Sequence, residues 1–250
     1  MDQPIKLATV VLPTYDEKEN IFDIVNAILD QQKRVAAFKI QVVISDSHSK
    51  DGTIEIAEQL SNKDPRVHLI VTNKRGIGVG LFNGIKYAID TLNTDVLIAM
   101  DSDFQHNPDD IPRLLEKISE GYDLVIASRF AEGVVNEIPW YRWVMSVVAN
   151  QMIRMMLNIK DVREITTSFR AFTRGLFQKI ETLPIPWQED SFIAVPVYVV
   201  KMLRSGANVT EIPMTMHARA GGYSKMIYWK YIRDVTIFCI KSGWSEMVGK

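Results

Sequence analysis

The sequence contains almost no cysteine: Cys239 is the single one among 250 residues. One cysteine cannot form a disulfide within the chain, which excludes a disulfide-stapled secreted scaffold and is typical of a reducing compartment. No run of 18 or more apolar residues occurs, so the sequence predicts no transmembrane helix. The N-terminus lacks the basic start and the apolar run of a signal peptide, and we expect none.

The chain also lacks a large net charge. It carries 29 Lys and Arg against 30 Asp and Glu, a net charge of −1 at pH 7, which argues against nucleic acid as a partner. The charge is uneven along the chain, because residues 1–128 sum to −7 and residues 129–250 to +6. An acidic half can hold a cation and a basic half can face an anion, although solvated surface charge produces the same split.

Short apolar runs in the first half of the chain are rich in β-branched residues, and they lie at residues 7–12, 40–45, 67–71, 95–100 and 122–127. Continuous rather than alternating apolar character favours strands covered on both faces of a parallel sheet. Amphipathic stretches near residues 17–32, 51–62, 78–92 and 109–120 predict intervening helices. The alternation predicts an α/β fold, a mostly parallel sheet flanked by helices, with ligands bound at the carboxyl ends of its strands.

The second half of the chain is less regular. We expect helices over residues 139–159 and 191–205, the latter interrupted by Pro196, and a strand over residues 209–214. Residues 139–159 and 223–240 combine Trp and Tyr with Lys and Arg beside apolar residues. This composition is typical of amphipathic helices at a membrane interface, and it also occurs in ordinary core helices.

The sharpest local feature is DSDFQH at residues 101–106, directly after the predicted strand at residues 95–100. Two carboxylates two residues apart repel one another unless a cation or a proton intervenes. Asp101 and Asp103, with the amide oxygen of Gln105, would suit Mg²⁺ or Mn²⁺, which bind few protein oxygens and keep waters and substrate phosphates. Acidic loop residues also cap helices or face water, and the position after a parallel strand is what favours the metal site.

Polar or glycine-rich loops follow other predicted strands. In SDSHSKDGT, residues 45–53, Asp46 at the strand end is suited to a ribose hydroxyl or a base edge, whereas Asp51 and Thr53 can simply cap the next helix. In PTYDE, residues 13–17, Tyr15 offers a ring for packing on a base. NKRGIGVG, residues 73–80, lacks the Lys-Ser/Thr of a Walker loop and is either a tight loop before a helix or a phosphate contact.

Taken together and in order, the blocks VVLPTYDEKENI, VISDSHSKDGT, KRGIGVGLFNGIKYA and MDSDFQHNPDDIP resemble glycosyltransferase family 2, whose members have the GT-A fold. DSDFQHNPD is similar to the D-A-D-x-Q-H-P-P-E block of the polyprenyl-phosphate sugar transferases of the dolichol-phosphate mannose synthase type. Residues 127–129, ASR, and the blocks EIP and RAGGYSK at residues 211–213 and 219–225 resemble further blocks of that type. The ordered set covers roughly residues 5–230 and is specific, although each block alone is not.

The resemblance implies a GT-A, Rossmann-like fold and an inverting transfer of a hexose from a nucleoside diphosphate sugar to a polyprenyl (dolichyl) phosphate. GDP-mannose is the favoured donor and UDP-glucose the other candidate. Residues 1–250 would form a single domain, in which residues 1–128 bind the nucleotide sugar and residues 129–250 bind the acceptor and carry the interfacial helices. The protein would be attached peripherally to the cytoplasmic face of a membrane.

The resemblance also implies roles for residues at matching positions. Donor binding would fall to Pro13, Tyr15, Glu17, Asp46 and Ser102. The Mg²⁺ or Mn²⁺ cofactor would be held by Asp101, Asp103 and Gln105. Positive charge for the acceptor phosphate would come from Arg129, Arg170, Arg219 and Lys225.

Two departures from the family pattern bear on the acceptor. Ser168 stands where the family commonly has the Gly of S-G-F-R, and residues 187–190, WQED, look like the Glu-Asp pair that other family 2 enzymes use as a base. A phosphate acceptor needs no such base, because its second pKa is ~6. A sugar hydroxyl acceptor on a glycan or small molecule does need one, and Asp190 would then serve. A protein that only binds nucleotide sugars or docks on membranes is a third alternative, against which the pair Asp101 and Asp103 argues.

Overall fold

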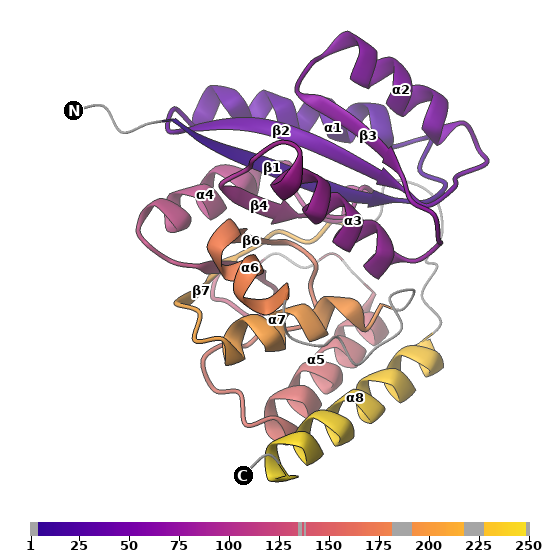
Figure 1. The fold of residues 1–250 in the computed structure, drawn as a ribbon. Helices are drawn as coiled ribbons and strands as arrows, with labels where there is room; N and C mark the ends of the chain where they lie inside the picture. Colours follow the sequence, from indigo (N-terminus) through magenta and orange to yellow (C-terminus); the bar gives the residue numbers. More distant parts are fainter. Residues whose placement is uncertain (1–4, 135–136, 138, 182–191, 218–227, 249–250) are drawn as a thin grey trace.

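The computed structural model describes residues 5–134, 137, 139–181, 192–217 and 228–248, and for residues 228 and 243–248 it describes the backbone alone. The described residues include a seven-stranded sheet with the order β3-β2-β1-β4-β6-β5-β7 (Figure 1). Its strands are β1 (Lys6–Thr14), β2 (Phe38–Asp46), β3 (Val67–Val71), β4 (Val96–Ala99), β5 (Leu124–Ser128), β6 (Arg170–Thr173) and β7 (Val209–Pro213).

The sheet is mostly parallel, as the sequence predicted. β1 pairs in parallel with β2 and with β4, β2 pairs in parallel with β3, and β5 does so with β7. β6 is antiparallel to both of its neighbours, β4 and β5. The chain runs outward from β1 to β3 and then returns to β4 on the other side of β1, so the carboxyl ends of β1 and β4 flank the switch point at which open α/β sheets bind ligands.

Helices cover both faces of the sheet. One core cluster includes residues of α1 (Ile21–Asp30), α2 (Thr53–Lys63) and α4 (Ile111–Ser119). The other includes residues of α3 (Ile77–Asp90), α5 (Trp140–Met156), α6 (Arg174–Glu181), α7 (Ala194–Arg204) and α8 (Tyr228–Val248). In β1, Val10 and Leu12 join the first cluster while Val11 joins the second, which explains why the strand sequences are apolar throughout. Two short 3₁₀ helices, η1 (Gln31–Arg34) and η2 (Pro108–Asp110), complete the described elements.

Glycines within α3 allow that helix to lie close to β1. A Cβ on Gly84 would overlap the side chain of Val11, and a Cβ on Gly80 would lie 3.2 Å from the Cβ of Pro13. These two glycines therefore serve helix–strand packing. The close approach of α3 leaves Gly76 and Ile77, at the start of the helix, in the wall of a cavity beside β1.

The structure corrects one predicted feature of the second half. Pro196 does not interrupt its helix, because it is the third residue of α7, in the first turn, where its backbone nitrogen would have no partner within the helix. β6 and α6 were not predicted. Within the described part of the chain, no helix has both the length and the apolarity needed to cross a membrane.

Candidate active site

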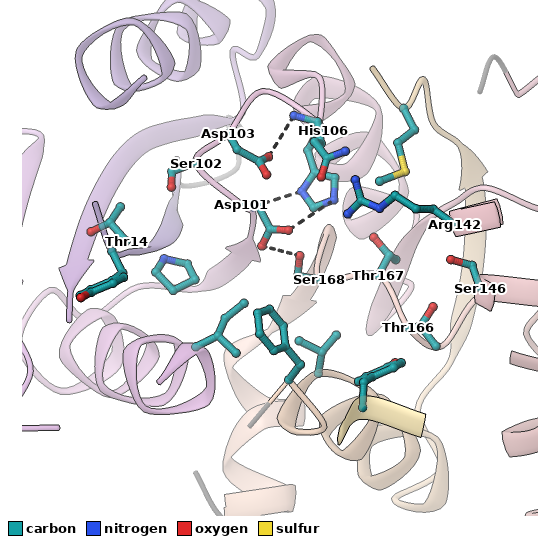
Figure 2. Close-up of a pocket in the computed structure, with 18 of the residues that line it drawn as sticks. Thr14, Asp101, Ser102, Asp103, His106, Arg142, Ser146, Thr166, Thr167 and Ser168 are labelled. Atoms are coloured by element: carbon teal, nitrogen blue, oxygen red, sulfur yellow. Dashed lines mark hydrogen bonds and ion pairs between the residues drawn. The ribbon is translucent and has the colours of Figure 1, made fainter. Parts of the chain in front are cut away.

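A cavity of about 370 Å³ lies at the carboxyl ends of β1 and β4, which is the size of a small-molecule pocket (Figure 2). Its two ends differ in chemistry. One end is polar and is lined by Tyr15, Glu17, Ser47, Arg75, Asp101, Ser102, Asp103 and Gln105. The other end lies between α5, α7 and α8, where apolar and aromatic side chains contribute most of the lining, among them Met145, Ala149, Phe192, Val195 and Tyr231.

The loops after β1 and β2 are joined at the polar end of the cavity. The backbone N–H of Asp16 donates to Oγ of Ser49 at 2.8 Å, and the N–H of Lys50 donates back to Oδ1 of Asp16 at 3.0 Å. The N–H of Glu17 donates to Oγ1 of Thr53 at 2.9 Å. These reciprocal bonds fix the loop that carries Tyr15 and Glu17, so the predicted donor-binding residues of the first loop are held in place.

Asp46 is not part of the cavity lining; its carboxylate lies between the end of β1 and the loop after β2. It is completely buried, and its carboxylate accepts hydrogen bonds from the hydroxyl of Thr14 at 3.1 Å and from the N–H and hydroxyl of Ser49 at 2.8 and 2.6 Å. In this arrangement Asp46 organises the two loops. Its direct contact with the nucleoside stays a prediction.

Tyr15 lies against a cation at the same end. The guanidinium of Arg75, in the loop before α3, lies 4.8 Å from the centre of the Tyr15 ring, a cation–π contact. Pro13, at the end of β1, also lines this wall. Three of the predicted donor residues, Pro13, Tyr15 and Glu17, therefore surround one region of the cavity.

Asp101 and Asp103 both line the cavity, immediately beyond β4. The side chain of Asp101 is one-third exposed, whereas Asp103 is buried and one of its oxygens accepts the N–H of Gln105 at 3.1 Å. Oδ1 of Asp101 accepts the hydroxyl of Ser168 at 2.8 Å. The backbone N–H of Asp101 donates to Nδ1 of His106 at 3.1 Å.

This donor set fits a divalent ion that keeps other ligands. The described residues contain no cluster of three or more His, Cys, Asp or Glu side chains that could enclose a metal by themselves. Mg²⁺ and Mn²⁺ do not need one, since one or two carboxylates plus substrate phosphates and waters suffice. Asp101 and Asp103, with Gln105 beside them in the lining, supply hard oxygen atoms on the wall that faces the Tyr15 loop.

Arg129 lies in the cavity wall, but most of its guanidinium is already engaged. It forms a two-pronged ion pair with the fully buried Glu164, with Nε to Oε2 at 2.6 Å and Nη2 to Oε1 at 2.9 Å. Nη2 also donates to Thr166 and Nη1 donates to Ser146. Burial alone would lower the pKa of Arg129 and raise that of Glu164, but their attraction outweighs it, so the pKa of Arg129 is raised and that of Glu164 is lowered.

Arg170 is not among the residues that line the cavity. It is buried in β6, and its Nη1 donates to the backbone oxygen of Val195 at 3.1 Å. Burial lowers its pKa to about 10, so it stays charged at neutral pH. Its role is to tie β6 to the first turn of α7, and direct contact with a phosphate, as predicted, has no support from this position.

Arg142 and Ser146 are among the cavity residues that the sequence analysis missed. Arg142 extends from the first turns of α5 into the cavity, and no carboxylate among the described residues pairs with it (Figure 2). Ser146, one helical turn later, lies in the same wall and contacts Arg129. The amphipathic composition of residues 139–159 gave no signal that distinguished Arg142 from Arg154, the other arginine of the segment. Predicted residues Asp190, Arg219 and Lys225 lie outside the described residues.

Known proteins share this sequence pattern and fold. Residues 9–181, more than half of the chain, match the family described as glycosyl transferase family 2. The chain is 32% identical over 227 residues to polyprenol monophosphomannose synthase of Mycolicibacterium smegmatis, a match that covers 90% of this chain and 82% of that protein.

Two solved structures have the same fold at low sequence identity. One is glucosyl-3-phosphoglycerate synthase of Mycobacterium tuberculosis in complex with Mn²⁺, UDP and glucosyl-3-phosphoglycerate, with a TM-score of 0.65, 16% identity and coverage of 98% of this chain and 80% of that chain. The other is a mannosyltransferase of Pyrobaculum calidifontis in complex with GDP-Man and Mn²⁺, with a TM-score of 0.60, 16% identity and coverage of 99% and 65%. The GT-A fold is thereby confirmed, and the chain belongs to glycosyl transferase family 2 and is a glycosyltransferase.

Proposed function

We propose that this glycosyltransferase moves a hexose, with mannose favoured, from a nucleoside diphosphate sugar to a polyprenyl phosphate and inverts the anomeric centre. One observation carries the proposal: a single cavity joins a carboxylate pair at its polar end to an arginine without a carboxylate partner among the described residues, beside an apolar end. The name of the M. smegmatis relative supports a mannosyl donor and a polyprenol-based product.

The polar end would receive the donor. Tyr15 and Arg75 offer a ring and a cation to the nucleotide, and Asp101 and Asp103 would hold Mg²⁺ or Mn²⁺ against its diphosphate. When bound, the ion neutralises the negative charge that develops on the departing diphosphate. A mannose donor, with GDP-mannose favoured, is supported by the M. smegmatis relative, which is named a polyprenol monophosphomannose synthase.

The other end would receive the acceptor phosphate. The hydrogen bonds of Arg129 to Glu164, Ser146 and Thr166 use four of its five N–H groups, and the remaining one is on Nη1, beside Ser146. Arg142 adds a guanidinium from the same helix as Ser146. Arginine can grip a phosphate with two parallel hydrogen bonds, and the neighbouring apolar lining suits the first isoprene units of a lipid.

The chemistry of this acceptor requires little from the protein. A phosphomonoester is largely a dianion at pH 7, because its second pKa is ~6. One phosphate oxygen forms the bond to C1 of the sugar while the bond from C1 to the donor diphosphate breaks and its electron pair leaves with the nucleoside diphosphate. No proton moves, so no general base is needed. The residues of the cavity have to bring two anions together and exclude water.

The direct test is a transfer assay with radiolabelled GDP-mannose or UDP-glucose, Mn²⁺ or Mg²⁺, and an acceptor. We expect label in the lipid fraction with dolichyl phosphate and none with dolichol, which has a hydroxyl in place of the phosphate. Label in a water-soluble glycan or small molecule, with none in lipid, would instead support a hydroxyl acceptor with Asp190 as base.

Arg142 provides a specific prediction for the acceptor end. We expect Arg142→Gln to lower kcat/KM for dolichyl phosphate by about 10–100-fold, because a hydrogen bond to a charged group contributes about 1.5–3 kcal/mol. The KM for the donor should not change. Arg154→Gln is the matched control, since it removes the same charge from α5 at a position outside the cavity lining. Equal effects of the two variants would show that Arg142 acts only through the charge of the helix.

A membrane surface is the natural source of this acceptor. α5 and α8 lie side by side at one end of the molecule (Figure 1). On α5 the exposed residues Trp140, Val144, Val148 and Met155 share one face, and on α8 Trp229, Ile232 and Ile240 do so. Trp140 and Trp229 are 77% and 82% exposed. We propose that this surface, the α5–α8 apolar face, binds the bilayer interface on the cytoplasmic side, where tryptophan is favoured.

Liposome flotation tests the α5–α8 apolar face. We expect the double variant Trp140→Glu, Trp229→Glu to lower partitioning onto anionic vesicles at least ~10-fold, because each buried aromatic side chain contributes about 1.5–3 kcal/mol. Phe22→Glu is the control, since Phe22 is a half-exposed aromatic residue on α1, at the other end of the molecule (Figure 1). Flotation of the double variant at the wild-type level would contradict the assignment.

A further inference from the structure

Ser168 makes a contact that the family pattern does not supply. It lies in the segment between α5 and β6, it is almost fully buried in the cavity wall, and its hydroxyl donates to Oδ1 of Asp101 at 2.8 Å (Figure 2). The glycine found at this position in the family pattern has no hydroxyl. Ser168 therefore gives the Asp101 carboxylate a hydrogen-bond donor that a glycine at this position would not provide.

A second contact fixes the main chain of Asp101. Nδ1 of His106 accepts the backbone N–H of Asp101 at 3.1 Å, and the His106 ring stacks on Phe169 with 5.1 Å between ring centres. A neutral imidazole that accepts at Nδ1 carries its proton on Nε2. Nε2 lies 4.0 Å from Oδ2 of Asp101, which is too far for a hydrogen bond.

The two oxygens of Asp101 are consequently unequal. Oδ1 is held by Ser168, whereas Oδ2 accepts no hydrogen bond from any of the described residues. The side chain is one-third exposed, so Oδ2 is the oxygen available to a ligand in the cavity. A carboxylate held through one oxygen presents the other as a single ligand atom in a fixed direction.

We propose that Ser168 is a positioning residue that makes Asp101 bind the divalent ion through Oδ2 alone and thereby favours Mn²⁺ or Mg²⁺ over Ca²⁺. Small ions of octahedral geometry take one oxygen per carboxylate, whereas Ca²⁺ accommodates bidentate carboxylates and six to eight ligands. Hydrogen bonds to ligating carboxylates are worth about 10–100-fold in metal affinity. The inference rests on the proposed function, since it assumes that Asp101 is a metal ligand.

The test measures metal binding directly, in the absence of transfer. Free Mn²⁺ is titrated by electron paramagnetic resonance in the presence of GDP, and Ca²⁺ is then used as a competitor. We expect Ser168→Ala and Ser168→Gly to raise the Kd for Mn²⁺ about 10–100-fold and the Kd for Ca²⁺ by a smaller factor. Ser168→Thr keeps a hydroxyl and should retain the wild-type ratio of the two affinities.

The outcomes separate this inference from the proposed function. Wild-type affinities in both hydroxyl-free variants, or an equal loss of Mn²⁺ and Ca²⁺ binding, would overturn the role of Ser168 while the metal site stands. A wild-type protein that binds no Mn²⁺ with GDP would overturn the metal site itself. Circular dichroism identifies any variant that fails to fold, and the glycine variant then replaces the alanine variant, because glycine is the residue of the family pattern.

Discussion

Asp103→Asn should reduce sugar transfer by about 10²–10³-fold or more while the protein stays folded. Asp103 is buried in the cavity wall beyond β4, and asparagine has the same shape without the charge. Loss of one negative charge from the site weakens binding of the metal ion that would stabilise the departing diphosphate. Removal of one such electrostatic contact typically lowers kcat by about 10²–10³-fold. The measurement is the rate of labelled lipid formation at saturating Mn²⁺.

Asp109→Asn is the matched control for this variant. Asp109 belongs to the same acidic block, but its side chain is exposed on η2 and pairs with Arg34 at the surface. We expect it to leave the rate unchanged. A near-normal rate for Asp103→Asn, with the control also normal, would remove Asp103 from the metal site.

Glu164→Gln should have the largest effect on stability, a loss of about 3–5 kcal/mol in the free energy of unfolding. Both members of the pair are buried, and the substitution leaves the Arg129 guanidinium without its counter-ion. Urea denaturation followed by circular dichroism measures the loss. Glu120→Gln, at an exposed ion pair on the surface, is the control and should not shift the transition.

The double variant Arg129→Met, Glu164→Gln separates stability from function. The amide oxygen that replaces the carboxylate at position 164 can still accept the backbone N–H groups of Thr166 and Thr167 that Oε1 of Glu164 accepts, and it faces a neutral side chain. We expect most of the lost stability to return, while transfer to dolichyl phosphate stays low because Arg129 is missing. A double variant as unstable as Glu164→Gln would show that the carboxylate, and not the unpaired charge, governs stability.

The same pair predicts how stability depends on pH. The folded pKa of Glu164 is lowered from its ordinary value of 4.5, so the ion pair contributes its full stability above about pH 4.5 and loses it as the pH falls through the lower, folded value. Below pH 4.5 we expect the wild-type unfolding free energy to fall more steeply than that of the double variant. Parallel curves would contradict the assignment.

The sequence predicted the donor half well because its signals are local. Continuous apolar runs identified the strands β1 to β5 within a few residues, and DSDFQH follows one of those runs directly. The parallel-sheet rule then placed Asp101, Asp103 and the Tyr15 loop at one edge, where the structure has them. The uneven charge also has a structural counterpart, since carboxylates of the first half and arginines of the second meet in one cavity.

The acceptor half depends on contacts between distant residues, which a single sequence does not reveal. β6 has four residues and exists because β4 and β5 pair with it on both sides, so its propensity alone gave no signal. Glu164 is one of two acids in a charged and polar stretch, and its importance comes from Arg129, 35 residues earlier. Arg170 had the residue type of a phosphate ligand but faces the core, a distinction that only the register of β6 decides.

We propose that Asp101 and Asp103 bind a divalent ion together with the donor diphosphate. Calorimetric titration of GDP-mannose into the protein, with and without Mn²⁺, tests it most directly. We expect Mn²⁺ to tighten donor binding in the wild-type protein and not in Asp101→Asn or Asp103→Asn. Equal donor affinity with and without Mn²⁺ and Mg²⁺ in the wild-type protein, for both GDP-mannose and UDP-glucose, would contradict it.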